Sequence, residues 1–402
     1  MDIEKIRKDF PILQKKENGK QIIYFDNACM ALKPKQVIDA MNDYYYNYSA
    51  CGGRSVHRLS NVVAIKCEET REKIKRYLNA KDSGEIIFTK NTTEGINTIA
   101  KGLALECGDV VLTTDKEHNS NLIPWHLLRK TKKIEHKIVK SNIDNTFNIE
   151  NFKEAMNQGV RLVSMVHTSN IDGYTIPAKE IIEISHDYDA LVMLDGAQSV
   201  PSKKTDVNKL DVDFLSFSIH KMCGPTGVGV LYGKQELLKV IDPLITGGET
   251  VEDSTYETFK LLPSPQKFEG GLQNYAGIIG AGAAIEYLAG IGLDKIGSHE
   301  YKLNKLMTAA LEDEKRIEII GPKDPKLRCG IFGFNIKGMN SHDIALALDE
   351  CANIMIRSGK QCVHSWFNAH KIDGCARASV YLYNTEKEVG IFIENVKKLI
   401  DV

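Results

Sequence analysis

Lys221 and Asp195 are the two residues whose type and position point most directly to covalent chemistry. Lys221 lies shortly after an apolar run at 214–218 and precedes a Gly-Pro turn. A lysine held in a desolvated pocket can lower its pKa and form a Schiff base. Asp195 ends a second apolar run at 190–194, where a carboxylate needs a partner such as a protonated pyridine nitrogen. A solvated loop lysine and a helix N-cap are the ordinary alternatives.

Two further segments could place a ligand against these residues. Residues 91–94, Asn-Thr-Thr-Glu, stand where a strand is predicted to turn into a helix. Such a segment caps a helix, and its N–H groups can also cradle a phosphate. His118, taken alone, is better explained as a structural residue. Gln198 follows Asp195 by three positions and could lie beside its carboxylate.

A cysteine and an arginine near the C-terminus could act on a substrate. Cys362 follows a strand-like run, and an isolated cysteine is commonly an inert buried thiol. Here the neighbouring Arg357 and Lys360 could favour the thiolate, which is the nucleophilic form. Arg377 precedes a strand predicted at 378–383. It could be a surface charge or a bidentate clamp for a carboxylate.

Short apolar runs that alternate with helical periodicity are expected to position these side chains. Strands are predicted at 22–25, 85–89, 109–113, 161–167, 190–194, 214–218 and 227–232. Continuous apolar strands separated by helices indicate a parallel sheet covered on both faces, which holds ligands at the carboxyl ends of its strands. The polar residues at those ends are therefore expected to share one site. After about residue 290 the pattern becomes α+β and predicts a smaller domain.

The composition limits the class of protein. Its 402 residues carry 52 Lys+Arg and 53 Asp+Glu, a net charge of −1, which argues against a nucleic-acid-binding surface. The nine cysteines are an odd number in a long chain, unlike a secreted disulfide framework, so we expect a reduced, cytoplasmic protein. The first ten residues are charged and contain no apolar core, so we do not expect a signal peptide there. The Gly- and Ala-rich stretch 276–293 is predicted to be a buried helix rather than a membrane span.

The order of these motifs is more specific than any one of them. Thr-Thr-Glu, His-x-Ser-Asn, Asp-Gly-Ala-Gln and Ser-x-His-Lys follow one another, and the set resembles the class V aminotransferase family of pyridoxal-phosphate enzymes. Within it, Arg-x-Gly-x-x-Cys, Arg-Ala-Ser and Tyr-Asn-Thr resemble the cysteine desulfurase and selenocysteine lyase branch, which serves sulfur mobilisation. The resemblance runs from Phe25 to about Val389. It implies an α/β fold of the type I pyridoxal-phosphate transferases, with a mostly parallel seven-stranded sheet and a smaller α+β domain.

The resemblance also implies a role for each candidate residue. Lys221 would bind the cofactor covalently and later move the substrate Cα proton, while Asp195 keeps the pyridine nitrogen protonated. His118 would stack on the ring, with Gln198 at its hydroxyl and Asn170 nearby. The phosphate ligands would be Thr92, Thr93, Ser218 and His220.

The same resemblance implies how a substrate would react. Arg377, with Asn170 close by, would hold the substrate carboxylate, and Cys362 would be the nucleophile. L-cysteine would become L-alanine, leaving a persulfide on Cys362 that a sulfur-acceptor protein collects for iron–sulfur cluster or thio-cofactor synthesis. We expect a homodimer, with residues 1–20 packing on the small domain, 21–290 forming the cofactor domain and 291–402 forming the small domain that carries Cys362.

Several positions depart from the family pattern. Leu272 replaces a Thr that usually binds the phosphate of the other subunit, and leucine cannot donate a hydrogen bond. Residues 360–361 are Lys-Gln where the family commonly has a His. Four cysteines also stand in or beside segments expected to approach the site: Cys29, Cys51, Cys223 and Cys362. They could share a metal or iron–sulfur cluster, but no CxxC pair supports this, and we expect no metal.

Other functions fit parts of this pattern. A selenocysteine lyase, taking L-selenocysteine, would use the same residues, and a related lyase, epimerase or aminotransferase could retain Cys362 without using it. An idle sulfur-carrier scaffold is the alternative without catalysis. Retention of Lys221, Asp195, Gln198 and Arg377 argues against the scaffold, because a scaffold needs no electron sink.

Overall fold

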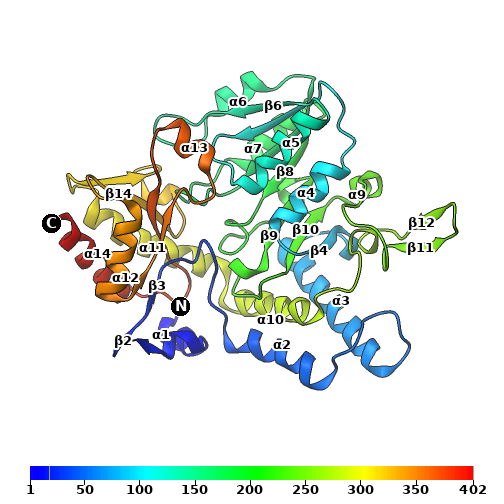
Figure 1. Cartoon of the computed structure of the whole chain (residues 1–402), viewed down its shortest axis with the longest axis horizontal. Coiled ribbons are helices and arrows are strands. Elements are labelled where there is room, and N and C mark those ends of the chain that lie inside the picture. Colours follow the sequence, from blue (N-terminus) through cyan, green and yellow to red (C-terminus); the bar gives the residue numbers. More distant parts are fainter. Residues whose placement is uncertain (18, 402) are drawn as a thin grey trace.

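A seven-stranded sheet forms the centre of the larger part of the chain (Figure 1). The computed structural model describes residues 1–17 and 19–401. The strands lie in the order β4-β10-β9-β8-β7-β5-β6, and all are parallel except β10. Their bounds are β4 Ile86–Thr89, β5 Val110–Thr114, β6 Glu135–Val139, β7 Val160–Val166, β8 Leu191–Asp195, β9 Phe214–Ser218 and β10 Gly229–Gly233. The predicted α/β fold is confirmed. Strand β6 was not predicted, because its outer position leaves most of it exposed.

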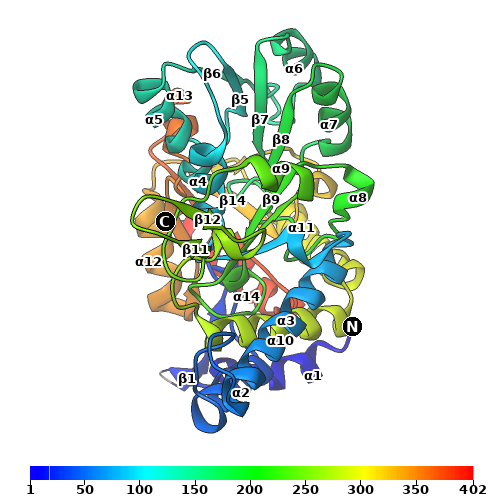
Figure 2. The same cartoon turned by 90° about the vertical axis from the view of Figure 1, so that its right-hand side faces the viewer.

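Helices cover both faces of this sheet, as Figures 1 and 2 show. Side chains alternate along each strand, so that Val111 packs on one face while Val110 and Leu112 pack on the other. One face is covered by α4 (Thr92–Gly102), α5 (Ile123–Thr131) and α9 (Gln235–Val240). The other is covered by α3 (Arg58–Leu78), α6 (Ile149–Ala155), α7 (Ala178–His186) and α10 (Tyr275–Ile291).

Helix α10 is the predicted Gly- and Ala-rich buried helix. Its glycines let two helices approach closely: a Cβ on Gly280 would lie 2.7 Å from Met41 of α2 (Lys35–Asn47), and one on Gly282 would lie 2.4 Å from Thr70 of α3. Across residues 1–17 and 19–401, no single helix is long and apolar enough to cross a membrane. Helices α10 and α11 (Leu293–Leu311) reach the required length and hydropathy only when taken together, and the pair is bent by 75°.

A second, smaller sheet follows in the C-terminal part. Its order is β13-β14-β17-β16, all antiparallel, and helices α11, α12 and α14 pack with it. The bounds are β13 Ile317–Ile320, β14 Ile331–Ile336, β16 Arg357–Gly359, β17 Cys375–Ser379, α12 Ser341–Ala352 and α14 Glu386–Ile400. The predicted strand 378–383 was placed too late. Arg377 lies in the middle of β17 rather than before it.

The N-terminal residues contact both parts, and Phe10 and Leu13 pack in the core of the larger one. Strand β3 (Ile23–Tyr24) pairs in parallel with β15 (Ile354–Met355), and Ile23 and Phe25 pack in the core of the smaller part, not in the large sheet. Before it, α1 (Ile3–Lys8) places Arg7 2.9 Å from Glu388 of α14. The remaining strands and α-helices of the described residues are β1 Lys16–Glu17, β2 Lys20–Gln21, β11 Val251–Ser254, β12 Phe259–Leu261, α8 Val207–Leu210 and α13 His364–Ala369.

Candidate functional site

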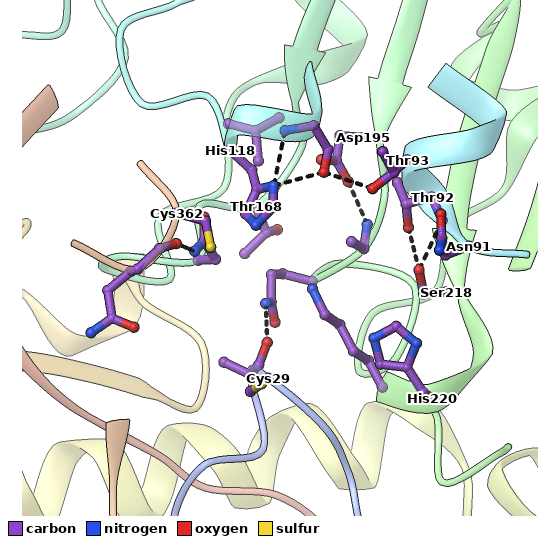
Figure 3. A pocket seen from close by; sticks show the side chains of 18 of the residues that line it. Cys29, Asn91, Thr92, Thr93, His118, Thr168, Asp195, Ser218, His220 and Cys362 are labelled. Atoms are coloured by element: carbon purple, nitrogen blue, oxygen red, sulfur yellow. Dashed lines mark hydrogen bonds between the residues drawn. The ribbon is translucent and has the colours of Figure 1, made fainter. Parts of the chain in front are cut away.

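The carboxyl ends of five parallel strands, β4, β9, β8, β7 and β5, meet at one edge of the large sheet and open into a cavity of about 260 Å³ (Figure 3). The smaller part closes its other side with residues around β16 and β17. Every site residue named from the sequence lines this cavity: Thr92, Thr93, His118, Asn170, Asp195, Gln198, Ser218, His220, Lys221, Cys362 and Arg377. The structure therefore brings the predicted set together, and the role of each member stays a proposal.

The amino end of α4 forms one wall of the cavity. Its cap is Asn91, and the Thr92 N–H donates to Ser218 Oγ at 2.9 Å. The Thr92 and Ser218 hydroxyls lie 2.6 Å apart, and those of Thr93 and Ser120 lie 2.7 Å apart. A helix amino terminus carries partial positive charge and free N–H groups. This hydroxyl-rich wall is therefore suited to a phosphate group.

Two imidazoles face the cavity in their neutral form. Burial, together with the charges of Lys221 and Arg377, lowers the pKa of His118 to about 4. Its Nδ1 lies 3.0 Å from the Ser120 hydroxyl. Burial and the neighbouring Lys221 likewise lower the pKa of His220 to about 4. At neutral pH both rings are uncharged, so His118 is able to stack on a flat aromatic ligand.

Asp195, which is buried, and Lys221, which is partly buried, influence each other's ionisation. Burial lowers the pKa of the Lys221 amine, which the Asp195 charge opposes. Burial raises the pKa of Asp195, although its carboxylate accepts a hydrogen bond from the Ala197 N–H at 2.9 Å. Gln198 lies on the same loop and donates to the Ala28 carbonyl at 2.7 Å. A buried carboxylate with so few donors is suited to a cationic ring nitrogen.

Arg377 is buried and only partly satisfied. Its Nη1 donates to the Asn170 carbonyl at 2.9 Å, and its Nη2 donates to Asp26 Oδ1 at 3.1 Å. Among the residues that the structure describes, its Nε has no hydrogen-bond partner, and neither does the side-chain oxygen of Asn170. A buried donor and a buried acceptor that both lack partners at one cavity indicate a polar ligand. A substrate carboxylate would satisfy the guanidinium.

Cys362 is held in an unusual backbone conformation. Both Gln361 and Cys362 have left-handed φ values, of 50° and 60°, which are unfavourable for residues other than glycine. Neighbouring residues hold the segment, since Asn119 N–H donates to the Cys362 carbonyl and the Asn170 amide donates to the Gln361 carbonyl, both at 2.8 Å. The strained segment presents the Cys362 side chain to the cavity.

The four cysteines singled out from the sequence do not lie together. Cys29 and Cys362 line the cavity, whereas Cys223 is completely buried in the core, and burial raises its pKa. Cys51 lies 3.7 Å from the Tyr275 hydroxyl. Among the described residues, no group of three His, Cys, Asp or Glu side chains is arranged to hold a metal ion. Only Cys29 and Cys362 of the four therefore share a cavity.

The structure also places two other residues that depart from the family pattern. Leu272 is 71% exposed and does not line the cavity of its own chain. Gln361, which replaces a family histidine, is buried and donates to the Gly359 and Cys375 carbonyls, both at 3.1 Å. Its amide therefore braces the backbone beside Cys362 rather than handling a proton.

Comparison with known proteins identifies the family. The model of the family described as aminotransferase class-V matches residues 23–392. The chain belongs to the class-V aminotransferase family. Over 99% of its length it is 38% identical to a probable cysteine desulfurase of Halalkalibacterium halodurans, of which 98% is covered. A cysteine desulfurase of Haloferax volcanii is 34% identical over 98% of this chain and 96% of its own. The apo structure of the cysteine desulfurase from Thermococcus onnurineus superposes with a TM-score of 0.94, at 36% identity over 99% and 98% of the two chains.

Pyridoxal phosphate is the cofactor of this member of the class-V family, and the residues present fit it. The α4 wall suits the phosphate, the buried Asp195 suits the pyridine nitrogen and the partly buried Lys221 suits the aldehyde carbon. Two contributors were not predicted. Ser120 links His118 to Thr93 through hydrogen bonds, and Asp26 pairs with Arg377 across 351 positions of the chain. The motifs contain both residues, but only the fold shows what they contact.

Proposed function

We propose that this chain is a cysteine desulfurase, which converts L-cysteine to L-alanine and leaves the sulfur on Cys362 as a persulfide. The observation that carries the proposal is one cavity holding three groups: a partly buried lysine for the cofactor, a buried arginine for the substrate carboxylate and the Cys362 thiol. An aminotransferase has no use for a thiol presented on a strained segment at that place. The relatives named cysteine desulfurase support the same conclusion.

The surroundings of each residue suggest its role in the reaction. When bound, pyridoxal phosphate acts as an electron sink for charge that develops at the substrate Cα. The Arg377 guanidinium orients the carboxylate, and the Lys221 amine, whose pKa is lowered by burial, can take the Cα proton. The Cys362 thiolate then attacks the substrate sulfur. The Cβ–S bond breaks, an S–S bond forms on Cys362, and protons delivered to carbon complete L-alanine.

We further propose that the enzyme works as a homodimer in the cytoplasm and passes its sulfur to an acceptor protein. Exposed aromatic and aliphatic side chains support the dimer, since Tyr46, Phe259 and Leu272 are 83%, 71% and 71% exposed. The cysteines, all free thiols, support a reducing compartment. A persulfide that is not removed would block the next turnover, which supports an acceptor.

Product analysis combined with peptide mass spectrometry tests the proposed activity. The holoenzyme is given L-cysteine, alanine is quantified, and tryptic peptides are examined by mass spectrometry for one added sulfur. The natural enzyme should form alanine and carry sulfur on Cys362, while Cys362→Ala should lose alanine formation but keep the absorbance of bound cofactor. Cys351→Ala is the matched control, because Cys351 is exposed and outside the cavity. Unchanged alanine formation by Cys362→Ala, or a protein that stays colourless with added pyridoxal phosphate, would refute the proposal.

A further inference from the structure

Cys29 is a second thiol in the cavity that holds Cys362 (Figure 3). It follows β3 and reaches the cavity from the N-terminal part of the chain. The Arg357 Nη1 donates a hydrogen bond to the Cys29 sulfur at 2.9 Å. Cys223 and Cys375 differ from it in being completely buried in apolar cores. Cys29 is therefore not a core-packing residue, but a thiol held by a cation at the reaction site.

Positive charge surrounds the Cys29 sulfur on several sides. Besides the Arg357 guanidinium, the amines of Lys33 and Lys221 lie close enough for the charge of a Cys29 thiolate to raise their pKa. Cys362 acts on the pKa of Lys221 in the same direction. The Lys221 amine thus lies within electrostatic reach of both sulfurs. The thiolate is the form of a cysteine that attacks sulfur.

We propose that Cys29 is a second sulfur carrier, which takes the terminal sulfur from the Cys362 persulfide inside the cavity. This inference rests on the proposed desulfurase function. The Cys29 thiolate attacks the outer sulfur of the persulfide, a new S–S bond forms on Cys29, and the bond between the two Cys362 sulfurs breaks. Its electron pair leaves on Cys362 as a thiolate, and the proton of the outer sulfur stays with that sulfur. The exchange has no net oxidation and needs no other reactant.

The transfer predicts how many alanines each chain forms in the initial burst. After it, the Cys362 thiolate is free to react with another L-cysteine before any acceptor arrives. Without an acceptor, each chain should form about two alanines in its initial burst, with one sulfur on Cys29 and one on Cys362. Cys29→Ser should form about one, which is a twofold reduction in burst amplitude.

The test uses the holoenzyme, ³⁴S-labelled L-cysteine, a rapid quench with an alkylating agent and tryptic mass spectrometry. Trypsin cuts after Lys20 and Lys360, so residues 21–35 and 361–371 give peptides that each contain a single cysteine. Cys329→Ala is the matched control, because Cys329 lines a neighbouring small cavity beside Lys221 but not the one that holds Cys362. This control should keep the burst and both labelled peptides.

The expected result is label on Cys362 first and on Cys29 afterwards, and on neither residue in Cys362→Ala. Label that stays on Cys362 alone in the natural enzyme would overturn the carrier role while leaving the desulfurase function intact. Absence of label from both residues, with no alanine formed, would overturn the two proposals together. Label on Cys29 in Cys362→Ala would overturn the order of transfer. A disulfide between the two peptides, with release of sulfide, would show attack on the inner sulfur and would also overturn the proposal.

Discussion

Replacement of Arg377 by lysine tests the proposed carboxylate site most directly. The guanidinium is buried, with Nη1 bound to the Asn170 carbonyl and Nη2 to Asp26, while Nε has no partner within the described part of the chain. Arg377→Lys keeps the charge but replaces three nitrogens by one. Its single ammonium cannot satisfy Asp26, the carbonyl and a substrate carboxylate with the same geometry.

The size of the effect follows from the bond that is lost. At least one charge-assisted hydrogen bond to the substrate carboxylate should be missing, which is worth about 1.5–3 kcal/mol. Since about 1.4 kcal/mol corresponds to a tenfold change, kcat/KM for L-cysteine should fall by roughly 10- to 100-fold. Because the carboxylate contact is made in the ground state as well as in the transition state, the change should appear mainly in KM.

The assay measures alanine formation over a range of L-cysteine concentrations. Cysteamine, which lacks the carboxylate, supplies the specific comparison: its binding, followed by cofactor absorbance, should change by less than about twofold. Arg328→Lys is the matched control, because Arg328 is equally buried but outside the cavity, and it should leave KM unchanged. A folded, cofactor-loaded Arg377→Lys enzyme with unaltered kcat/KM would refute the assignment, as would an equal loss of cysteamine binding.

Three further predictions test the cofactor attachment, a buried ion pair and a buried imidazole. Borohydride treatment should add the cofactor's mass to the peptide containing Lys221 in the natural enzyme and to no peptide in Lys221→Ala. Cofactor mass on a different peptide of the variant would contradict this attachment. Glu269→Gln should lower the free energy of unfolding by about 3–5 kcal/mol, because Arg71 would lose the carboxylate that it binds at 2.8 and 2.9 Å; a loss below about 1 kcal/mol in urea denaturation would disagree. Burial lowers the pKa of His136 to about 4, from an ordinary value near 6.5. The unfolded chain therefore binds that proton first as the pH falls, so the natural protein should lose stability relative to His136→Gln by up to about 1.4 kcal/mol per pH unit between about pH 6 and 4. A stability difference that does not change with pH over this range would count against the buried neutral imidazole.

The sequence by itself was sufficient to place most of the site on the large sheet. Asp195 and Ser218 end apolar runs, and Lys221 follows one closely, so their positions at strand ends follow from hydrophobic patterning. Parallel strands bring their carboxyl ends to one edge, which is why residues from separate runs could be predicted to meet. The roles of these residues came from the order of the motifs, not from the patterning.

Contacts between the two parts of the chain depended on the tertiary structure. Arg377 was predicted to precede a strand, yet it lies within β17 and reaches Asp26 across 351 positions. Cys29 and Arg357 meet across 328 positions. No local period encodes such pairs, because they depend on how β3 adds to β15 and how the small sheet docks on the large one. Patterning therefore determined which residues lie at strand ends, whereas packing decided which cation holds which thiol and carboxylate.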